Sequence, residues 1–184
     1  MKPLPLLLAL ALSLAACGGT ADTAVPRPVA YPRIAVCDSL FRPVGGLPVN
    51  IEVNAGAVAQ VDSVRPDGSV WLTVSYPAYG GAKLYLTLSH ATPEVIANRS
   101  ERLSMNTGGA PTQLTTVVSA AGFESSVALT PAGSAIPVQI LSTDGGWALS
   151  GAFVLEAAAS APDSVRPVVE AVRSDLIHAA KKLR

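Results

Sequence analysis

Residues 165–183, VRPVVEAVRSDLIHAAKKL, form the most regular hydrophobic pattern in the chain. At a helical period, six apolar side chains of this stretch fall within about 40° of one line along the helix. They are Val165, Val169, Val172, Leu176, Ala180 and Leu183. Asp163 or Ser164 is a suitable N-cap, and Pro167 would still lie in the first turn. We therefore predict a C-terminal amphipathic helix that lies on a sheet.

Segments with strand character fill most of the chain before this helix. Residues 49–53 alternate apolar and polar side chains, which predicts a half-buried strand. The segments 70–76 and 82–89, on either side of the loop 77–81, look like a hairpin. Further strands are predicted at 33–37, 117–121, 124–129, 135–141 and 147–155, and a loop is predicted at 38–48. Pro137 favours an edge position for the strand at 135–141.

A second helix is predicted in the middle of the chain. Thr92 is a good N-cap, Pro93 suits the first helical position, and Glu94 complements the helix dipole. Gly108 and Gly109 end the element. Runs of strands with two separated helices predict an α+β domain, a mostly antiparallel sheet packed by a long C-terminal helix and one central helix.

The N-terminus has the pattern of an export signal. Lys2 precedes an apolar run, Leu4 to Leu14, which is too short to span a bilayer and has the length of a secretory signal core. Leu14-Ala15-Ala16-Cys17 resembles a bacterial lipobox, in which the Cys thiol takes a diacylglyceryl group before cleavage. Residues 1–16 would then be a signal peptide, and Cys17 would anchor the protein through two or three acyl chains such as palmitate. The alternative is an ordinary signal peptide with a chance Cys near its end.

Residues 17–32 are expected to form a flexible tether between this lipid anchor and a single α+β domain at 33–184. The tether passes from small residues to Pro26, Pro28 and Pro32, and it cannot bury enough apolar surface to offset its ordering entropy. No acidic cluster follows Cys17, which favours a domain that faces the periplasm.

The balance of charge argues against nucleic acid and anionic membrane surfaces as partners, and the cysteine content argues against a disulfide or a reactive thiol. The 13 Lys and Arg residues balance 13 Asp and Glu, so the chain lacks the basic field that binds nucleic acid or an anionic membrane surface. With Cys17 lipidated, Cys37 has no intramolecular disulfide partner. No neighbouring His or basic residue favours its thiolate form, which indicates a structural Cys.

The sequence shows no motif for catalysis, metal binding or cofactor binding. The two His residues, His90 and His178, have no ligand spacing, and H-x-x-x-H and C-x-x-C are absent. Ser150 lacks the G-x-S-x-G elbow, and the glycine pairs do not fit a phosphate loop. We therefore expect a protein that is not an enzyme and holds no cofactor or metal. A hydrolase whose Ser, His and Asp converge only in space stays open as an alternative.

Two blocks of sequence, one at each end of the mature chain, carry a resemblance to a known family. The first is residues 26–34, PRPVAYPRI, and Tyr76-Pro77 with Ala82-Lys83-Leu84 match between the blocks. The second block contains Gly151-Ala152-Phe153-Val154-Leu155, Pro162-Asp163-Ser164, Pro167-Val168-Val169 and Asp175-Leu176-Ile177-His178. Together with the lipobox, these blocks resemble the gliding motility lipoprotein GldD family.

This resemblance implies an accessory lipoprotein of the gliding machinery and of the type IX secretion system, which share components. The implied partners are the membrane, through the N-terminal lipid, and envelope proteins of that complex. The implied role is protein interaction.

Asp175 and His178 are predicted to lie away from the apolar stripe, three residues apart, where the carboxylate can reach the imidazole. Because no core needs them, we expect both, together with Arg33 of the first block, to contact a partner. Two other interpretations stay open. One is a solvated helix face with a weak ion pair. The other is internal use of the two side chains by a loop or by residues 26–34.

A periplasmic protein that binds a small ligand is the main alternative function. At the level of the fold, an antiparallel sheet with a long C-terminal helix is similar to PsbP/Mog1-like domains. Binding would need a concave pocket lined by aromatic residues such as Trp71, Tyr85 and Trp147. The alternative for these aromatics is packing in the core or in a hairpin.

Overall fold

The computed structural model describes residues 40–131, 134–155 and 162–184. The chain divides into two compact units, 1–32 and 33–184, and all described residues belong to the second. Several predictions therefore lie outside the described residues, namely the signal peptide, Cys17, the tether, Arg33 and the strand at 33–37. In the described part of the chain, no helix is both long enough and apolar enough to cross a membrane.

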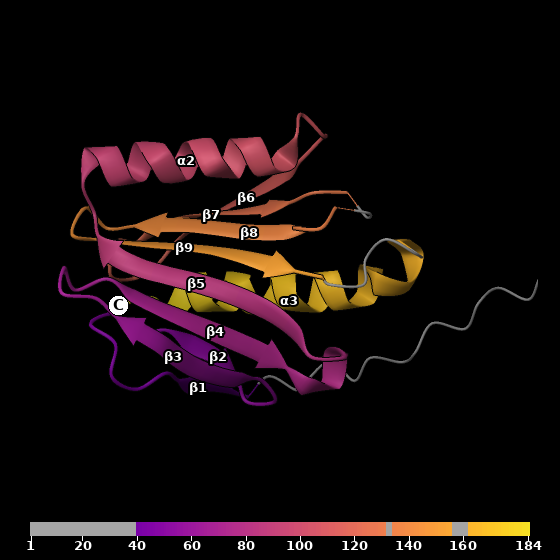
Figure 1. Cartoon of the computed structure of the whole chain (residues 1–184), viewed down its shortest axis with the longest axis horizontal. Helices are drawn as coiled ribbons and strands as arrows, with labels where there is room; N and C mark the ends of the chain where they lie inside the picture. The colour runs from indigo at the N-terminus through magenta and orange to yellow at the C-terminus, as the bar shows by residue number, and fades with distance from the viewer. Residues whose placement is uncertain (1–39, 132–133, 156–161) are drawn as a thin grey trace, which may run out of the picture. The chain divides into compact units, whose positions relative to one another are not determined.

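The predicted α+β class is confirmed by a seven-stranded antiparallel sheet that packs against two helices. The strand order is β3-β4-β5-β9-β8-β7-β6, with every neighbouring pair antiparallel (Figure 1). The strands in this order are β3 Val58–Val64, β4 Val70–Tyr76, β5 Ala82–His90, β9 Trp147–Val154, β8 Val138–Thr143, β7 Glu124–Leu129 and β6 Gln113–Val118. The hairpin of β4 and β5 is confirmed, and its loop contains the 3₁₀ turn η1, Pro77–Tyr79.

The C-terminal helix α3, Pro162–Lys182, covers one face of this sheet, which we call the inner face. Five of the six residues in the predicted apolar stripe are buried, and they join one core with alternate residues of the strands. Val165, the sixth, is half-buried. The helix begins at Pro162, before the predicted caps, so Pro167 lies in its second turn rather than its first.

A separate two-stranded sheet, β1 Phe41–Pro43 and β2 Glu52–Asn54, packs against α3. The alternation predicted at 49–53 is confirmed, because Val49, Ile51 and Val53 are all buried. The prediction of a loop throughout 38–48 is wrong at β1, where three residues pair with β2 across a turn of Pro and Gly residues.

Two strand predictions differ from the structure for identifiable reasons. β8 lies between β7 and β9 rather than at an edge, because Pro137 precedes the strand and does not need to donate to its ladder. The strand predicted at 117–121 ends at Val118, because the Ser119 hydroxyl accepts hydrogen bonds from the amides of Ala121 and Phe123 and turns the chain. β3 was not predicted, and it is an edge strand whose apolar residues Val58, Val61 and Val64 are exposed.

Gly151 lets the central strand β9 fit between its neighbours. A Cβ at this position would lie 2.3 Å from Leu86 Cδ2 and 3.0 Å from Ile140 Cγ2. These two side chains extend over β9 from β5 and β8, with which Gly151 is paired. A glycine is therefore required for close packing of the inner face.

The central helix α2, Pro93–Thr107, confirms the predicted helix and its boundaries. The Thr92 hydroxyl accepts a hydrogen bond from the Val95 amide at 3.2 Å, and Gly108 ends the helix in the left-handed conformation. α2 contacts β8 and β9, and the strand residues that face it alternate with those buried against α3. The two helices therefore lie on opposite faces of the sheet, and we call the face beneath α2 the outer face.

We expect Leu176→Ala to lower the free energy of unfolding by about 2–5 kcal/mol, because a buried leucine is truncated in a close-packed core. Leu176 is 2% exposed. Chemical denaturation of the full chain measures the change. Ser174→Ala, on the exposed side of the same helix, is the matched control and should have little effect. An unchanged midpoint for Leu176→Ala would contradict the assignment of this side chain to the core.

Candidate functional site: the groove beneath α2

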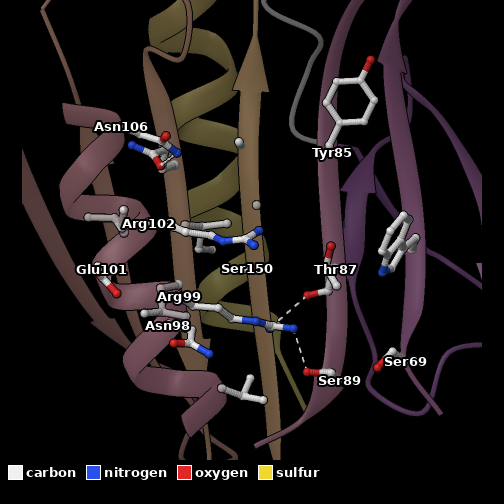
Figure 2. A pocket seen from close by; sticks show the side chains of 18 of the residues that line it. Ser69, Tyr85, Thr87, Ser89, Asn98, Arg99, Glu101, Arg102, Asn106 and Ser150 are labelled. Atoms are coloured by element: carbon white, nitrogen blue, oxygen red, sulfur yellow. Dashed lines mark hydrogen bonds between the residues drawn. The ribbon is translucent and has the colours of Figure 1, made fainter. Parts of the chain in front are cut away.

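An open groove of about 980 Å³ lies between α2 and the outer face of the sheet. Its floor is built from outward-facing residues of β5, β8 and β9, and α2 forms one wall. Residues of β4 and of the turn between β3 and β4 form the far side. Figure 2 shows α2 on one side of the floor and Tyr85 on the other.

The groove exists because α2 does not pack closely onto the sheet. None of its 15 residues is buried. The floor beneath it contains the small residues Ser150 and Ala152. Since helices in proteins are mainly stabilised by burying an apolar face, α2 needs other attachments.

Arg99 provides the main attachment of α2. Its Nη1 donates a hydrogen bond to the carbonyl oxygen of Ala148 at 2.7 Å. Figure 2 shows the other two, from Nη1 to the carbonyl oxygen of Thr87 at 3.3 Å and from Nη2 to the Ser89 hydroxyl at 2.7 Å. The guanidinium thus bridges β5 and β9. Burial, and then the nearby cation of Arg102, lower the pKa of Arg99 from its ordinary value.

A second attachment lies near the end of the helix. Asn106 Nδ2 donates to Gln139 Oε1 on β8 at 2.9 Å. Gln139 is only 3% exposed, and its Nε2 is buried without a hydrogen-bond partner. A buried donor without an acceptor is costly, so the groove floor carries an unused hydrogen-bonding group.

Arg102 lies between these two attachments. Figure 2 shows its side chain reaching from α2 over β9, above the floor of the groove. It is exposed, and no hydrogen bond or ion pair joins it to another described residue. The groove therefore contains one guanidinium that is free to bind a ligand.

Two of the three aromatic residues singled out from the sequence line this groove. Trp71 and Tyr85 are each 44% exposed, on the outer face of β4 and β5. Arg65 stacks over the Trp71 ring, with its Cζ 4.4 Å from the ring centroid. Trp147 does not line the groove, and it stacks on His90 with the ring centroids 4.2 Å apart.

Ser150, His90 and Asp67 all line the groove, which bears on the hydrolase alternative. No hydrogen bond joins any two of these three residues. Asp67 instead accepts from the Ser69 amide at 2.9 Å in the turn between β3 and β4, and this hydrogen bond lowers the pKa of Asp67. In the described ranges, no group of three or more His, Cys, Asp and Glu residues is placed to hold a metal ion.

Asp175 and His178 lie outside the groove, on the part of α3 that packs against β1 and β2. His178 stacks on Phe41 with the ring centroids 3.5 Å apart, and its Nε2 is 3.0 Å from Glu52 Oε2. Asp175 Oδ1 accepts from Asn54 Nδ2 at 3.3 Å. The β1–β2 segment crosses this helix face and uses both side chains, so they do not face outward as a pair. The alternative of internal use by another segment agrees with these contacts. Contact of the two side chains with a partner protein stays an untested prediction, as does that of Arg33.

The environment of Asp175 disfavours its ionised form. Burial raises the pKa of this carboxyl above its ordinary value, and Asn54, His178 and Tyr76 offset the effect only in part. Burial, followed by the negative charge of Asp175, also raises the pKa of Tyr76. Tyr76 itself belongs to the core, where it stacks on Tyr79 and meets the edge of Phe153.

No family model matches the chain, and no curated protein matches it as a relative. The resemblance to the GldD family therefore stays a prediction from the quoted residues.

Asp175→Asn is expected to stabilise the protein at neutral pH. A carboxyl whose pKa is raised on folding contributes stability below the pKa of Asp in the unfolded chain, about 3.9, and loses it as pH rises through the folded value. The stability gain from Asn should therefore shrink on going from about pH 7 towards about pH 4. Chemical denaturation of both proteins at several pH values measures this gain in stability. Asp67→Asn is the control. It should lower the stability of the protein at neutral pH, because the pKa of Asp67 is lowered on folding. A loss of stability for Asp175→Asn at neutral pH would contradict this interpretation.

Arg99→Gln should loosen α2, because it leaves buried oxygen acceptors on β5 and β9 without their donor. Loss of such charged hydrogen bonds costs about 1–3 kcal/mol. Hydrogen exchange of the α2 amides should accelerate, whereas exchange in α3 should not change. Arg102→Gln, which removes a cation three residues away that has no such bonds, should leave exchange in α2 unchanged. Equal effects of the two substitutions would contradict the role given to Arg99.

Proposed function

We propose that this protein is a lipid-anchored, non-enzymatic binding protein of the cell envelope, and that the groove beneath α2 is its binding site. The observation that supports this most strongly is that α2 spans the outer face of the sheet without burying any of its residues. The space left beneath it, about 980 Å³, lies at the upper end of the range for small-molecule sites.

The chemistry of the lining supports binding rather than simple loose packing. Gln139, whose amide has an unused donor, and Arg102, whose guanidinium is free, both line the groove. Exposed aromatic rings at Trp71 and Tyr85 supply flat contact surfaces nearby. A few polar groups that fix orientation, together with apolar surface that supplies affinity, are the usual composition of a ligand site.

The proposed place of this binding protein is the gliding and type IX secretion machinery. The support for it is the lipobox at residues 14–17 and the ordered resemblance to the GldD family. Lipid attached to Cys17 would hold the domain at a membrane, and the tether would let it reach envelope proteins of the complex.

The role of the groove as a binding site can be tested by filling it with a large side chain. Ser150 lies on the floor and is half-buried, so Ser150→Trp should occupy the space that a ligand would use. Ser126→Trp places the same ring on the outer face of β7, outside the groove, and is the matched control. Full-length protein purified in detergent from its native envelope should carry a bound small molecule in native mass spectrometry. We expect Ser150→Trp to lose that mass and Ser126→Trp to keep it. Equal occupancy in both variants would place the ligand elsewhere.

The anchor and the cellular system can be tested together. Tagged full-length protein should fractionate with membranes, and Cys17→Ser should be released to soluble fractions or fail to be processed. Affinity purification from detergent-solubilised envelopes, followed by mass spectrometry, should enrich gliding or secretion components. An unrelated lipoprotein with the same tag is the control. A partner list identical to that of the control would contradict the proposed system and leave the groove unaffected.

A further inference from the structure

We propose that the ligand of the groove is a saccharide that carries a carboxylate, and that Arg102 and Gln139 bind this carboxylate. The inference rests on the proposed binding role and specifies the chemistry of the same site.

The case for an acceptor group begins with Gln139. This side chain is 3% exposed, its Oε1 already accepts from Asn106, and its Nε2 has no partner. The remaining amide hydrogens therefore require an acceptor that comes from outside the described residues. Gln139 and Arg102 both line the groove. Because Gln139 Nε2 is buried in the ligand-free protein, a turn of this amide towards the groove would let one ligand group meet both donors. A carboxylate suits this pair, because a guanidinium binds a planar carboxylate through parallel hydrogen bonds.

The charge of the lining favours a single negative charge on the ligand. Three Arg residues, Arg65, Arg99 and Arg102, face two acidic residues, Asp67 and Glu101. Arg99 makes three hydrogen bonds to the backbone and to Ser89, and Arg65 stacks on Trp71. Among the described lining residues, one net positive charge therefore remains, and Arg102 is the guanidinium without a hydrogen bond, an ion pair or a ring contact. A polyanion such as nucleic acid needs several such cations, and it would also meet Asp67.

The other lining residues indicate the chemistry of the rest of the ligand. Trp71 and Tyr85 lie on neighbouring strands, diagonal to each other across the β4–β5 ladder, and both are exposed. Flat aromatic rings of this kind can pack against the C–H face of a sugar ring. Asn98, Thr87 and Ser150 are polar groups within reach of hydroxyls along the same groove. This combination of rings and short polar side chains suits a chain of sugar units.

Two other classes of ligand fit less well. A fatty acid requires its chain to be buried, and an open groove with polar groups along its length would leave much of the chain in water. An extended peptide gains affinity by adding to a sheet edge, but the floor strands β5, β9 and β8 already pair on both sides. A saccharide needs neither an enclosed apolar tunnel nor a free strand edge.

The test is calorimetric titration of the full-length protein in detergent with matched probes. Tetragalacturonate that is methyl-esterified at all but one unit supplies a single carboxylate, and its fully methyl-esterified form has the same rings without the charge. A hyaluronan tetrasaccharide and a disaccharide containing N-acetylmuramic acid extend the acidic set. Palmitate and an acidic tetrapeptide represent the two competing classes.

We expect at least one acidic saccharide to bind and its neutral ester or amide to bind on the order of tenfold more weakly. Arg102→Gln should weaken binding of the acid by a similar factor and should barely change binding of the ester. Trp71→Leu should weaken both by the same factor. Arg166→Gln, at an exposed position of α3 outside the groove, is the charge control. The charge dependence thus separates carboxylate recognition from general contact with the rings.

The possible failures are distinguishable. Equal binding of acid and ester would overturn the carboxylate assignment. Binding of palmitate or the peptide but of no saccharide, abolished by Ser150→Trp, would overturn the saccharide and keep the groove as a binding site. Absence of binding by every probe, together with ligand-free native protein, would overturn the saccharide and the proposed function together.

Discussion

The apolar stripe of α3 is the constraint on which the rest of this structure depends. Side chains of a strand alternate between the two faces of a sheet, so the choice of face for one residue settles it for the whole strand. By burying Leu72, Leu86 and Leu149 in the core that α3 completes, the inner face forces Trp71, Tyr85 and Ser150 to the opposite face. A shift of register by one residue would bury a serine and an indole against α3 and expose the leucines. The groove residues are thus positioned by the packing on the far side of the sheet.

The outer face then remains to be covered, and α2 covers it only in part. Arg99 attaches α2 to β5 and β9 through its guanidinium, and the floor beneath the helix contains the small residues Ser150 and Ala152. The guanidinium is partly desolvated, which disfavours its charge, and its hydrogen bonds to carbonyl oxygens compensate for this cost. The attachment of α2 is therefore polar and specific, while the packing beneath it stays incomplete.

Sequence reasoning could predict the elements with strong local signals. The caps of α2, the hairpin of β4 and β5, and the buried stripe of α3 depend on neighbours in sequence, and each was predicted correctly. β1 and β3 escaped prediction because short or exposed strands show little apolar alternation, so their pairing depends on partners elsewhere in the chain. The position of β8 required knowledge of which strands flank it.

The candidate site was less accessible to sequence reasoning than the fold. Trp71 and Tyr85 could be named, because aromatic residues on half-buried strands have one free side. Arg99, Arg102 and Gln139 could not, since their roles depend on how high α2 stands above β8 and β9. Asp175 and His178 were expected to contact a partner, because a helical wheel contains no information about the β1–β2 segment that crosses them. Tertiary placement, and not residue type, decides these roles.

A ligand in the groove would supply the packing that α2 lacks. An isolated helix of 15 residues is marginal in water, and this one has good caps but no buried side chain. Its order therefore depends on a small number of polar contacts, of which the Asn106–Gln139 bond leaves a donor unused. A group that accepts from Gln139 and Arg102 at once would connect the helix to the floor of the sheet at a third point. Binding and the order of α2 are then coupled, because any ligand that binds only the folded arrangement stabilises it by mass action. Since α3 and the inner core are complete without the ligand, this stabilisation should be concentrated in α2 and in the strands that it covers.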